Sequence, residues 1–128
     1  MKVLDTAFLI DILRGKEETS KILKSQEHLL TTQINMYEVI RGLFLRNLSQ
    51  EKYIEIKELF ENIRLLSLDD NSIIKSAEIS SELLKQGQVI GDCDCLTAGI
   101  ALSNGITTIV TRDAEHFKRI KGIKVETY

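Results

Sequence analysis

The chain has 128 residues, of which 43% are hydrophobic and 5% aromatic, so we expect one compact domain with a core of Ile, Leu and Val. Its net charge of −2 comes from 17 basic and 19 acidic residues, which is not the strongly basic balance of a protein that binds nucleic acid by phosphate neutralisation alone. No apolar run approaches the roughly 20 residues of a membrane helix and no secretory signal is evident, so we expect a soluble, cytoplasmic protein without a membrane partner.

Short runs of apolar and β-branched residues predict strands. They lie at 3–4, 29–32, 65–68, 107–111 and 123–126. Apolar residues at helical spacing, bounded by capping residues or glycines, predict helices. They lie at about 7–13, 17–26, 34–45, 50–62, 70–87, 92–101 and 114–119, with Thr6 as the expected cap of the first. The third and fourth helices should form a hairpin.

Strands that alternate with helices favour an α/β fold, here a three-layer α/β/α sandwich with a mostly parallel central sheet. The chain contains no proline, repeat or low-complexity linker that would mark a boundary. Residues 1–128 are therefore expected to form a single domain.

Four carboxylates lie where these elements begin or end. Asp5 closes the first strand, Glu38 follows the second within one or two helical turns, Asp94 lies in the first turn of a helix rich in small residues, and Asp113 follows the strand at 107–111. Because parallel strands place their carboxyl ends at one edge of the sheet, we expect these acids to meet there. Such a cluster would bind a hard divalent cation, Mg²⁺ or Mn²⁺.

The two cysteines, Cys93 and Cys95, are separated by one residue. This spacing fits neither a zinc knuckle nor a redox Cys-x-x-Cys motif, and it makes a disulfide between them geometrically poor. We expect reduced thiols and no structural zinc.

The acids, their order and their neighbours resemble the PIN domain, the ribonuclease fold of the VapC-type toxins of toxin–antitoxin pairs. The matching segments are Leu4-Asp5-Thr6 with Phe8-Leu9-Ile10-Asp11, Tyr37-Glu38-Val39-Ile40-Arg41-Gly42, Ile90-Gly91 with Asp94, and Val110-Thr111-Arg112-Asp113 with Phe117. The resemblance covers essentially the whole chain. It implies a metal-dependent endoribonuclease whose acidic quartet is Asp5, Glu38, Asp94 and Asp113.

The resemblance also implies accompanying groups and partners. Thr6 and Thr111 match small hydroxyl positions beside the first and last acids. The implied partners are an RNA substrate, a small antitoxin protein that covers the active groove, and a second copy of the chain. The helical hairpin of residues 34–62 is the expected homodimer surface, because it carries more apolar side chains than a domain of this size must bury. These are Tyr37, Leu45, Leu48 and Tyr53.

Phosphodiester hydrolysis with a divalent cation needs no nucleophilic Ser, Cys or His. We expect Asp5 and Asp94 to be direct ligands of the main ion. Glu38 and Asp113 are expected to bind through water, to complete a second site or to orient the attacking water. Without metal, repulsion among clustered carboxylates should raise some of their pKa values.

Five further polar residues lie near these acids in the sequence. Asp92 is either an additional metal-facing carboxylate or a helix cap, and the helix dipole favours the cap. Asp11 is expected to point to solvent. Arg41 and Arg112 either contact RNA phosphates or form internal salt bridges. His116 is expected to be a surface or capping residue rather than a general acid.

Three other kinds of protein share some of these features. A catalytically silent PIN-like protein could serve as a scaffold or an RNA-binding partner, but the intact acidic quartet argues against it. Mg²⁺-dependent phosphatases and receiver domains also place acids at the carboxyl edge of a parallel sheet. The segments Asp5-Thr6-Ala7 and Thr111-Arg112-Asp113 match neither of those patterns.

Overall fold

The computed structural model describes residues 1–25 and 27–128, and its strands form one parallel sheet with the order β3-β2-β1-β4-β5. The strands are β1 (Lys2–Leu4), β2 (Leu29–Thr32), β3 (Arg64–Leu66), β4 (Thr108–Val110) and β5 (Lys124–Glu126). The helices are α1 (Thr6–Leu13), the 3-10 segment η1 (Glu17–Thr19), α2 (Ser20–Leu23), α3 (Gln33–Leu45), α4 (Gln50–Glu61), α5 (Asp70–Lys85), α6 (Asp92–Ser103) and α7 (Ala114–Phe117). The predicted α/β fold with a parallel sheet is confirmed.

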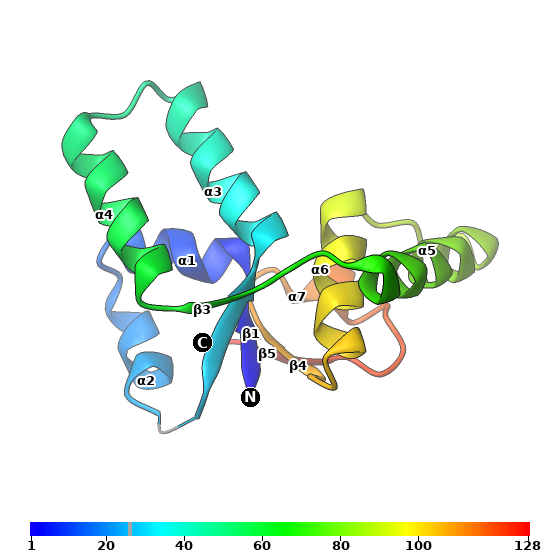
Figure 1. Ribbon diagram of the computed structural model, residues 1–128. Coiled ribbons are helices and arrows are strands. Elements are labelled where there is room, and N and C mark those ends of the chain that lie inside the picture. The colour runs from blue at the N-terminus through cyan, green and yellow to red at the C-terminus, as the bar shows by residue number, and fades with distance from the viewer. Residues whose placement is uncertain (26) are drawn as a thin grey trace.

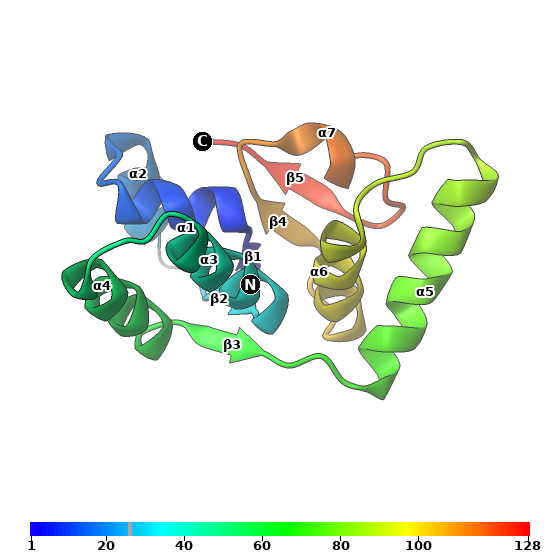
Figure 2. The same ribbon diagram turned by 90° about the horizontal axis from the view of Figure 1, so that it is seen from above.

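The sheet is covered on both faces. Side chains alternate between the faces of a strand, so Val3 and Ile109 enter one buried cluster while their neighbours Leu4 and Val110 enter the other. The first cluster includes residues of α5 and α6, and the second includes residues of α1, α3 and α4. Figure 2 shows these two groups of helices on opposite sides of the strands. The predicted three-layer arrangement is confirmed.

The chain order creates a crevice beside β1. From β1 the chain passes to β2 and β3 on one side and then returns to β4 on the other side of β1. Such a reversal opens a gap between helices at the carboxyl ends of the strands, where ligands bind in open α/β sheets. Leu4 of β1 is paired with Val110 of β4, so the residues after them, Asp5 and Thr111, emerge next to each other.

Helices α3 and α4 form the predicted hairpin, which projects beyond the sheet (Figure 1). Both helices begin at a capping hydroxyl. Thr32 accepts a hydrogen bond from the backbone N–H of Asn35, and Ser49 accepts one from that of Lys52. The cap at Thr32 fixes the start of α3 directly after β2, and Glu38 follows one and a half turns later.

Helix α6 packs against α5 at a glycine. A Cβ atom on Gly99 would lie 1.9 Å from Ser76 Oγ and 2.9 Å from the carbonyl oxygen of Ser72. Only glycine permits this approach. The contact fixes α6, whose first turn carries Asp94, against α5.

Some element boundaries differ from the sequence predictions. The helix expected over 17–26 is divided into η1 and α2 and ends at Leu23, and residue 26 lies outside the described part of the chain. The final helix ends at Phe117 rather than near 119. Both segments are too short and polar for a long apolar stripe to define their ends. Within the described residues, no helix is long and apolar enough to span a membrane.

Candidate active site

Asp5 occupies the centre of the crevice. Its carboxylate is almost fully buried and accepts hydrogen bonds from Thr111 Oγ1 at 2.9 Å and from Asn35 Nδ2 at 3.2 Å. Its backbone N–H donates to the carbonyl oxygen of Val110 at 3.0 Å, which ties it to β4. The carboxylate is therefore held in one orientation from two sides.

The pKa of Asp5 is raised to about 6, chiefly by burial and in smaller part by the negative charges of Asp94 and Glu38, against the opposing effect of the hydrogen bond from Thr111. A raised pKa was predicted for this cluster without metal, but the predicted cause, repulsion between carboxylates, is one of the smaller contributions. The main cause is burial and not repulsion between carboxylates. A cation at this position would stabilise the ionised form.

The four predicted acids line one cavity of about 650 Å³. Glu38 Oε1 accepts a hydrogen bond from Thr6 Oγ1 at 2.8 Å, and Asp94 Oδ2 lies 3.0 Å from His116 Nδ1. Asp113 stands at the N-cap position of α7. The structure thus brings together side chains from α3, α6 and the ends of β1 and β4.

The two predicted hydroxyl residues both contact the acids. Thr111 Oγ1 donates to Asp5 and accepts a hydrogen bond from the backbone N–H of Asp113 at 3.0 Å. Thr6 does not cap α1 as predicted, because Asp5 stands at the N-cap position and the Thr6 hydroxyl donates to Glu38 instead. Thr6 is the first residue of α1 and therefore stands one position after the cap.

Asn35 is a site residue that the sequence predictions missed. It is fully buried, and its Nδ2 donates to Asp5 Oδ1 and to Thr6 Oγ1, the latter at 3.0 Å. Its Oδ1 accepts a 2.7 Å hydrogen bond from Thr32 Oγ1. The sequence did contain a signal for this role, because Asn35 is a polar residue inside the apolar stripe of α3, three positions after the capping residue Thr32.

The expectation that Asp11 points to solvent is wrong. Asp11 is 1% exposed. Its Oδ1 accepts a 2.7 Å hydrogen bond from Arg112 Nη1, its Oδ2 accepts one from the Tyr128 hydroxyl, and Lys16 Nζ lies 3.7 Å away. These partners make burial of the charge tolerable.

The other candidate residues fall into different environments. Arg112 lines the acid cavity and forms the internal salt bridge with Asp11, while the guanidinium of Arg41 lies 5.5 Å from the centre of the Tyr37 ring. His116 is a surface residue, as predicted, yet it also lines the cavity at Asp94. Asp92 is exposed, stands after the N-cap residue Gly91, and does not line the cavity.

The cysteines remain apart from this chemistry. Cys93 and Cys95 are both free thiols, as predicted, and Cys95 is buried against the sheet. Burial raises the pKa of each thiol, so both remain protonated at neutral pH.

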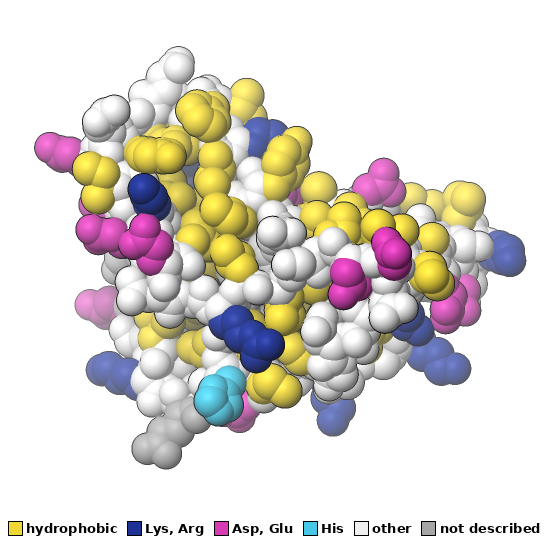
Figure 3. Space-filling view, viewed as in Figure 1, with side chains coloured by type: hydrophobic (Ala, Val, Ile, Leu, Met, Phe, Trp, Pro, Cys, Tyr) yellow, Lys and Arg dark blue, Asp and Glu magenta, His cyan; other side chains and the backbone are white. Residues whose placement is uncertain are grey.

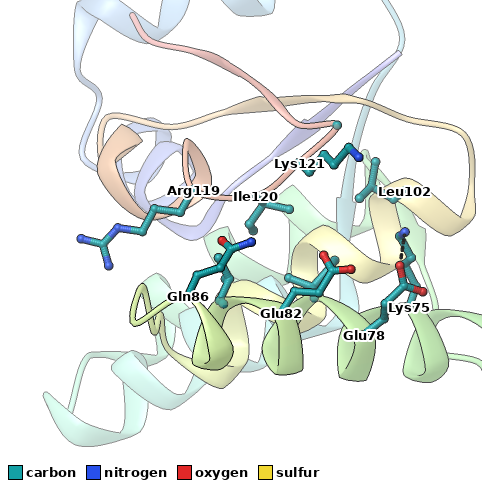
Figure 4. Close-up of a pocket in the computed structure, with 11 residues that line it drawn as sticks. Lys75, Glu78, Glu82, Gln86, Leu102, Arg119, Ile120 and Lys121 are labelled. Carbon is teal, nitrogen blue, oxygen red and sulfur yellow. Dashed lines mark hydrogen bonds and ion pairs between the residues drawn. The ribbon is translucent and has the colours of Figure 1, made fainter.

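A second cavity of about 460 Å³ lies between α5 and the segment that joins α7 to β5 (Figure 4). Its charged lining residues include Lys75, Glu78, Glu82, Arg119 and Lys121. The two cavities share no lining residue. The charged residues of this second cavity are both acidic and basic, and Lys75 Nζ is paired with Glu78 Oε1 at 3.2 Å. It therefore lacks the four gathered carboxylates of the first cavity.

The side chains of the first cavity offer the type of ligand that suits a hard divalent cation, because Mg²⁺ and Mn²⁺ prefer carboxylate oxygens. Among residues 1–25 and 27–128, no three Asp, Glu, His or Cys side chains are gathered closely enough to hold an ion. Oxygens of Asp94 and Glu38 instead engage His116 and Thr6.

A parallel sheet with four carboxylates in the crevice at its reversal point defines an α/β protein with a candidate cation site. The sequence model of the PIN domain matches residues 2–123, and the chain belongs to the PIN-domain family.

Relatives named as nucleases match over nearly the full length of the chain. The tRNA(fMet)-specific endonuclease VapC of Salmonella typhimurium is 28% identical over 129 residues, which cover 98% of this chain and 96% of that protein. Ribonuclease VapC1 of Methanocaldococcus jannaschii is 29% identical over 127 residues, which cover 98% of this chain and 85% of that protein.

Solved structures agree with the fold. VapBC2 from Rickettsia felis, bound to a DNA fragment from its promoter, superposes with a TM-score of 0.90 at 18% identity over 99% of this chain and 98% of that one. DNA-bound VapBC from Salmonella typhimurium gives a TM-score of 0.85 at 26% identity, over 98% of this chain and 96% of that one. At 18% identity the first likeness concerns the fold alone.

Proposed function

We propose that the chain is an endoribonuclease that requires Mg²⁺ or Mn²⁺ and acts as the toxin of a toxin–antitoxin pair. The observation that carries this proposal is the convergence of Asp5, Glu38, Asp94 and Asp113 on one cavity. The full-length relatives named as ribonucleases support the reaction class. Membership of the PIN-domain family leaves no support for a phosphatase or receiver domain.

Side chains of the chain itself supply the proposed metal ligands and hold them in place. Asp5 and Asp94 are the proposed direct ligands, and Glu38 and Asp113 bind through water, complete a second site or orient the attacking water. Thr111 and Asn35 fix the Asp5 carboxylate from both sides and keep it from rotating away. A cation held by these residues would supply polarisation of the scissile phosphate and a lowered pKa of water, so that hydroxide would be available as the nucleophile near neutral pH.

The proposed partners are an RNA substrate, an antitoxin protein and a second copy of the chain in the cytoplasm. The antitoxin is proposed from the resemblance to VapC-type toxins, and relatives named VapC support it. VapBC-5 of Mycobacterium tuberculosis, a member of the VapBC family of toxin–antitoxin systems, shares the fold with a TM-score of 0.74 at 20% identity. Arg41 and Arg112 are proposed phosphate contacts.

The proposed homodimer surface is the α3–α4 hairpin, and its most exposed apolar side chains are on α3. Tyr37, Phe44 and Leu45 are 56%, 70% and 74% exposed. They line a hollow of about 610 Å³ whose walls are mostly apolar. Figure 3 shows hydrophobic side chains gathered over the α3–α4 hairpin. Contiguous exposure of large apolar side chains is typical of surfaces that bind another protein.

The proposal is tested by incubating end-labelled total RNA and tRNA with the purified protein in Mn²⁺, Mg²⁺ or EDTA. Asp5→Asn and Asp94→Asn should abolish cleavage. Asp92→Asn is the matched control, because it makes the same change of charge at an exposed position outside the cavity. It should cleave like the parent protein.

Cleavage in EDTA, or in either cavity variant, would exclude the proposed site. A parent protein that binds RNA but cleaves none of these substrates in any metal would support the silent scaffold instead.

A further inference from the structure

Asp11 is a buried carboxylate with no part in the proposed chemistry. Charged carboxylates are seldom buried unless they have partners, and Asp11 has three, which come from different parts of the chain. Arg112 is 101 residues away, Tyr128 is 117 residues away, and Lys16 follows α1. The cluster therefore ties α1 to the segments after β4 and β5.

Arg112 lies between two residues of the acid site. Its neighbour Thr111 donates to Asp5, and Asp113 lines the same cavity. A guanidinium in this position is attracted to the four carboxylates. If it moved in among them, it would compete with a metal cation for their oxygens. The 2.7 Å bond from Nη1 to Asp11 holds it at the rim instead.

The remaining donors of Arg112 are available to a ligand. Its side chain is 40% exposed, and among the described residues its hydrogen bonds are confined to the one from Nη1 to Asp11. A guanidinium has five N–H donors in a planar fork, which suits two oxygens of a phosphate. Lys16, 46% exposed, adds a second cation near the same carboxylate.

Tyr128 completes the support of Asp11. Its ring packs edge-on against Phe8, with the ring centres 4.7 Å apart, and its hydroxyl donates to Asp11 Oδ2. Burial and the bond to Asp11 raise the pKa of Tyr128, so the phenol remains a donor. With Oδ2 occupied by Tyr128, Oδ1 faces Arg112.

We propose that Asp11 and Tyr128 are positioning residues that hold Arg112 at the cavity rim as the contact for an RNA backbone phosphate beside the scissile one. This inference rests on the proposed function. Asp11 acts through Arg112 and touches no substrate. Its role is to keep a cation close to the acids without letting it enter their site.

The test measures binding of a fluorescein-labelled, single-stranded RNA of mixed sequence, about ten nucleotides long, to the Asp94→Asn protein in Mn²⁺ over a range of salt concentrations. Arg112→Ala should weaken binding about tenfold and reduce the slope of log K against log salt by about 0.7, the value for one lost phosphate contact on a single strand. Asp11→Asn should weaken binding severalfold, and Tyr128→Phe less.

Combined variants separate positioning from general damage. If Asp11 acts through Arg112, adding Asp11→Asn to Arg112→Ala should cause no further loss of affinity. Arg64→Ala, at an exposed arginine of β3 at the sheet edge, is the control and should keep the parent affinity and slope. Arg112→Lys should keep the salt slope but lose part of the affinity, because lysine lacks the planar fork.

Two results would overturn the inference. One is unchanged affinity and salt slope in Arg112→Ala, and the other is unchanged or tighter binding in Asp11→Asn. If Asp11→Asn fails to fold, Tyr128→Phe, which removes only a hydroxyl, decides in its place. Metal-dependent tRNA cleavage by the parent protein is measured in parallel. If the parent cleaves tRNA while Arg112→Ala keeps the parent salt slope, only this inference fails. If the parent neither cleaves nor binds RNA, the proposed function fails as well.

Discussion

Thr111 Oγ1 donates a 2.9 Å hydrogen bond to Asp5 Oδ2 across 106 residues of sequence. The contact follows from the pairing of Leu4 with Val110, because the next residue of each strand then emerges at the same edge of the sheet. The hydroxyl also accepts the N–H of Asp113, so one side chain links the first and the last of the four acids. The geometry of the site is thus set by strand register.

The raised pKa of Asp5 predicts that the metal-free protein loses stability as pH rises. The folded state holds this proton more tightly than the unfolded chain, so ionisation opposes folding progressively between pH 3.8 and about 6. The free energy of unfolding should fall by about 3 kcal/mol through this group, since each pKa unit corresponds to about 1.4 kcal/mol. Asp5→Asn in EDTA should therefore be more stable than the parent at about pH 7.5, with a gap that closes near pH 4.

Urea unfolding at several pH values measures this gap. Asp92→Asn, at an exposed residue, should stay within about 0.5 kcal/mol of the parent protein. An Asp5→Asn protein that is less stable than the parent above neutral pH would contradict the prediction.

Asn35→Ala should destabilise the protein by about 2–3 kcal/mol. It removes a buried side chain that donates to Asp5 and Thr6 and accepts from Thr32, and it leaves these groups with unsatisfied polar atoms. RNA cleavage should also fall, because the Asp5 carboxylate loses one of its two side-chain donors. Urea unfolding and the cleavage assay measure the two effects.

The control is Asn62→Ala, which removes an exposed asparagine that bonds to the Glu58 carbonyl oxygen. It should cost less than about 0.5 kcal/mol and leave cleavage unchanged. Equal losses in the two variants would mean that Asn35 has no special link to the site.

The gathering of the four acids was predictable because it depends on topology. Asp5 and Asp113 follow strands, Asp94 begins a helix, and Glu38 lies in the helix after β2. A parallel sheet therefore brings all four to one edge. The burial of Asp11 was not predictable, because its partners Arg112 and Tyr128 join α1 only through tertiary structure. Sequence spacing near Asp11 predicts an exposed helical residue and contains no sign of either contact.

Gly99→Ala should destabilise the protein by about 3 kcal/mol or more, because the new methyl group would meet the α5 backbone at Ser76 N, 2.8 Å away, and at Ser72 O. Gly42→Ala is the matched control, since Gly42 is also inside a helix but no packing neighbour lies within 4 Å of the place where its Cβ would be. It should raise stability by about 0.5–1 kcal/mol, as alanine favours the helix. Thermal unfolding of both variants would show opposite shifts, and shifts of the same sign would contradict the packing of α5 on α6.

Cation binding should stabilise the folded protein. A cation at about a hundred times its dissociation constant adds about 2.7 kcal/mol to the free energy of unfolding. Mn²⁺ should therefore raise the melting temperature and EDTA should reverse the rise, whereas Asp5→Asn/Asp94→Asn should show little response. An identical rise in the parent and the double variant would place the binding elsewhere on the protein.

Leu45→Glu should shift the protein toward monomer. Leu45 is 74% exposed beside the hollow on α3, and a second copy seated there would have to bury the new charge without a partner. Leu48→Glu, at the end of the same hairpin, tests the extent of the surface, and Leu23→Glu on α2 is the control at a distant exposed leucine. Light scattering over a range of protein concentrations should give a lower average mass for Leu45→Glu than for Leu23→Glu. A twofold interface uses the same patch on both copies, so one substitution introduces two charges into it. An average mass of Leu45→Glu equal to that of the parent would remove α3 from consideration as the dimer surface.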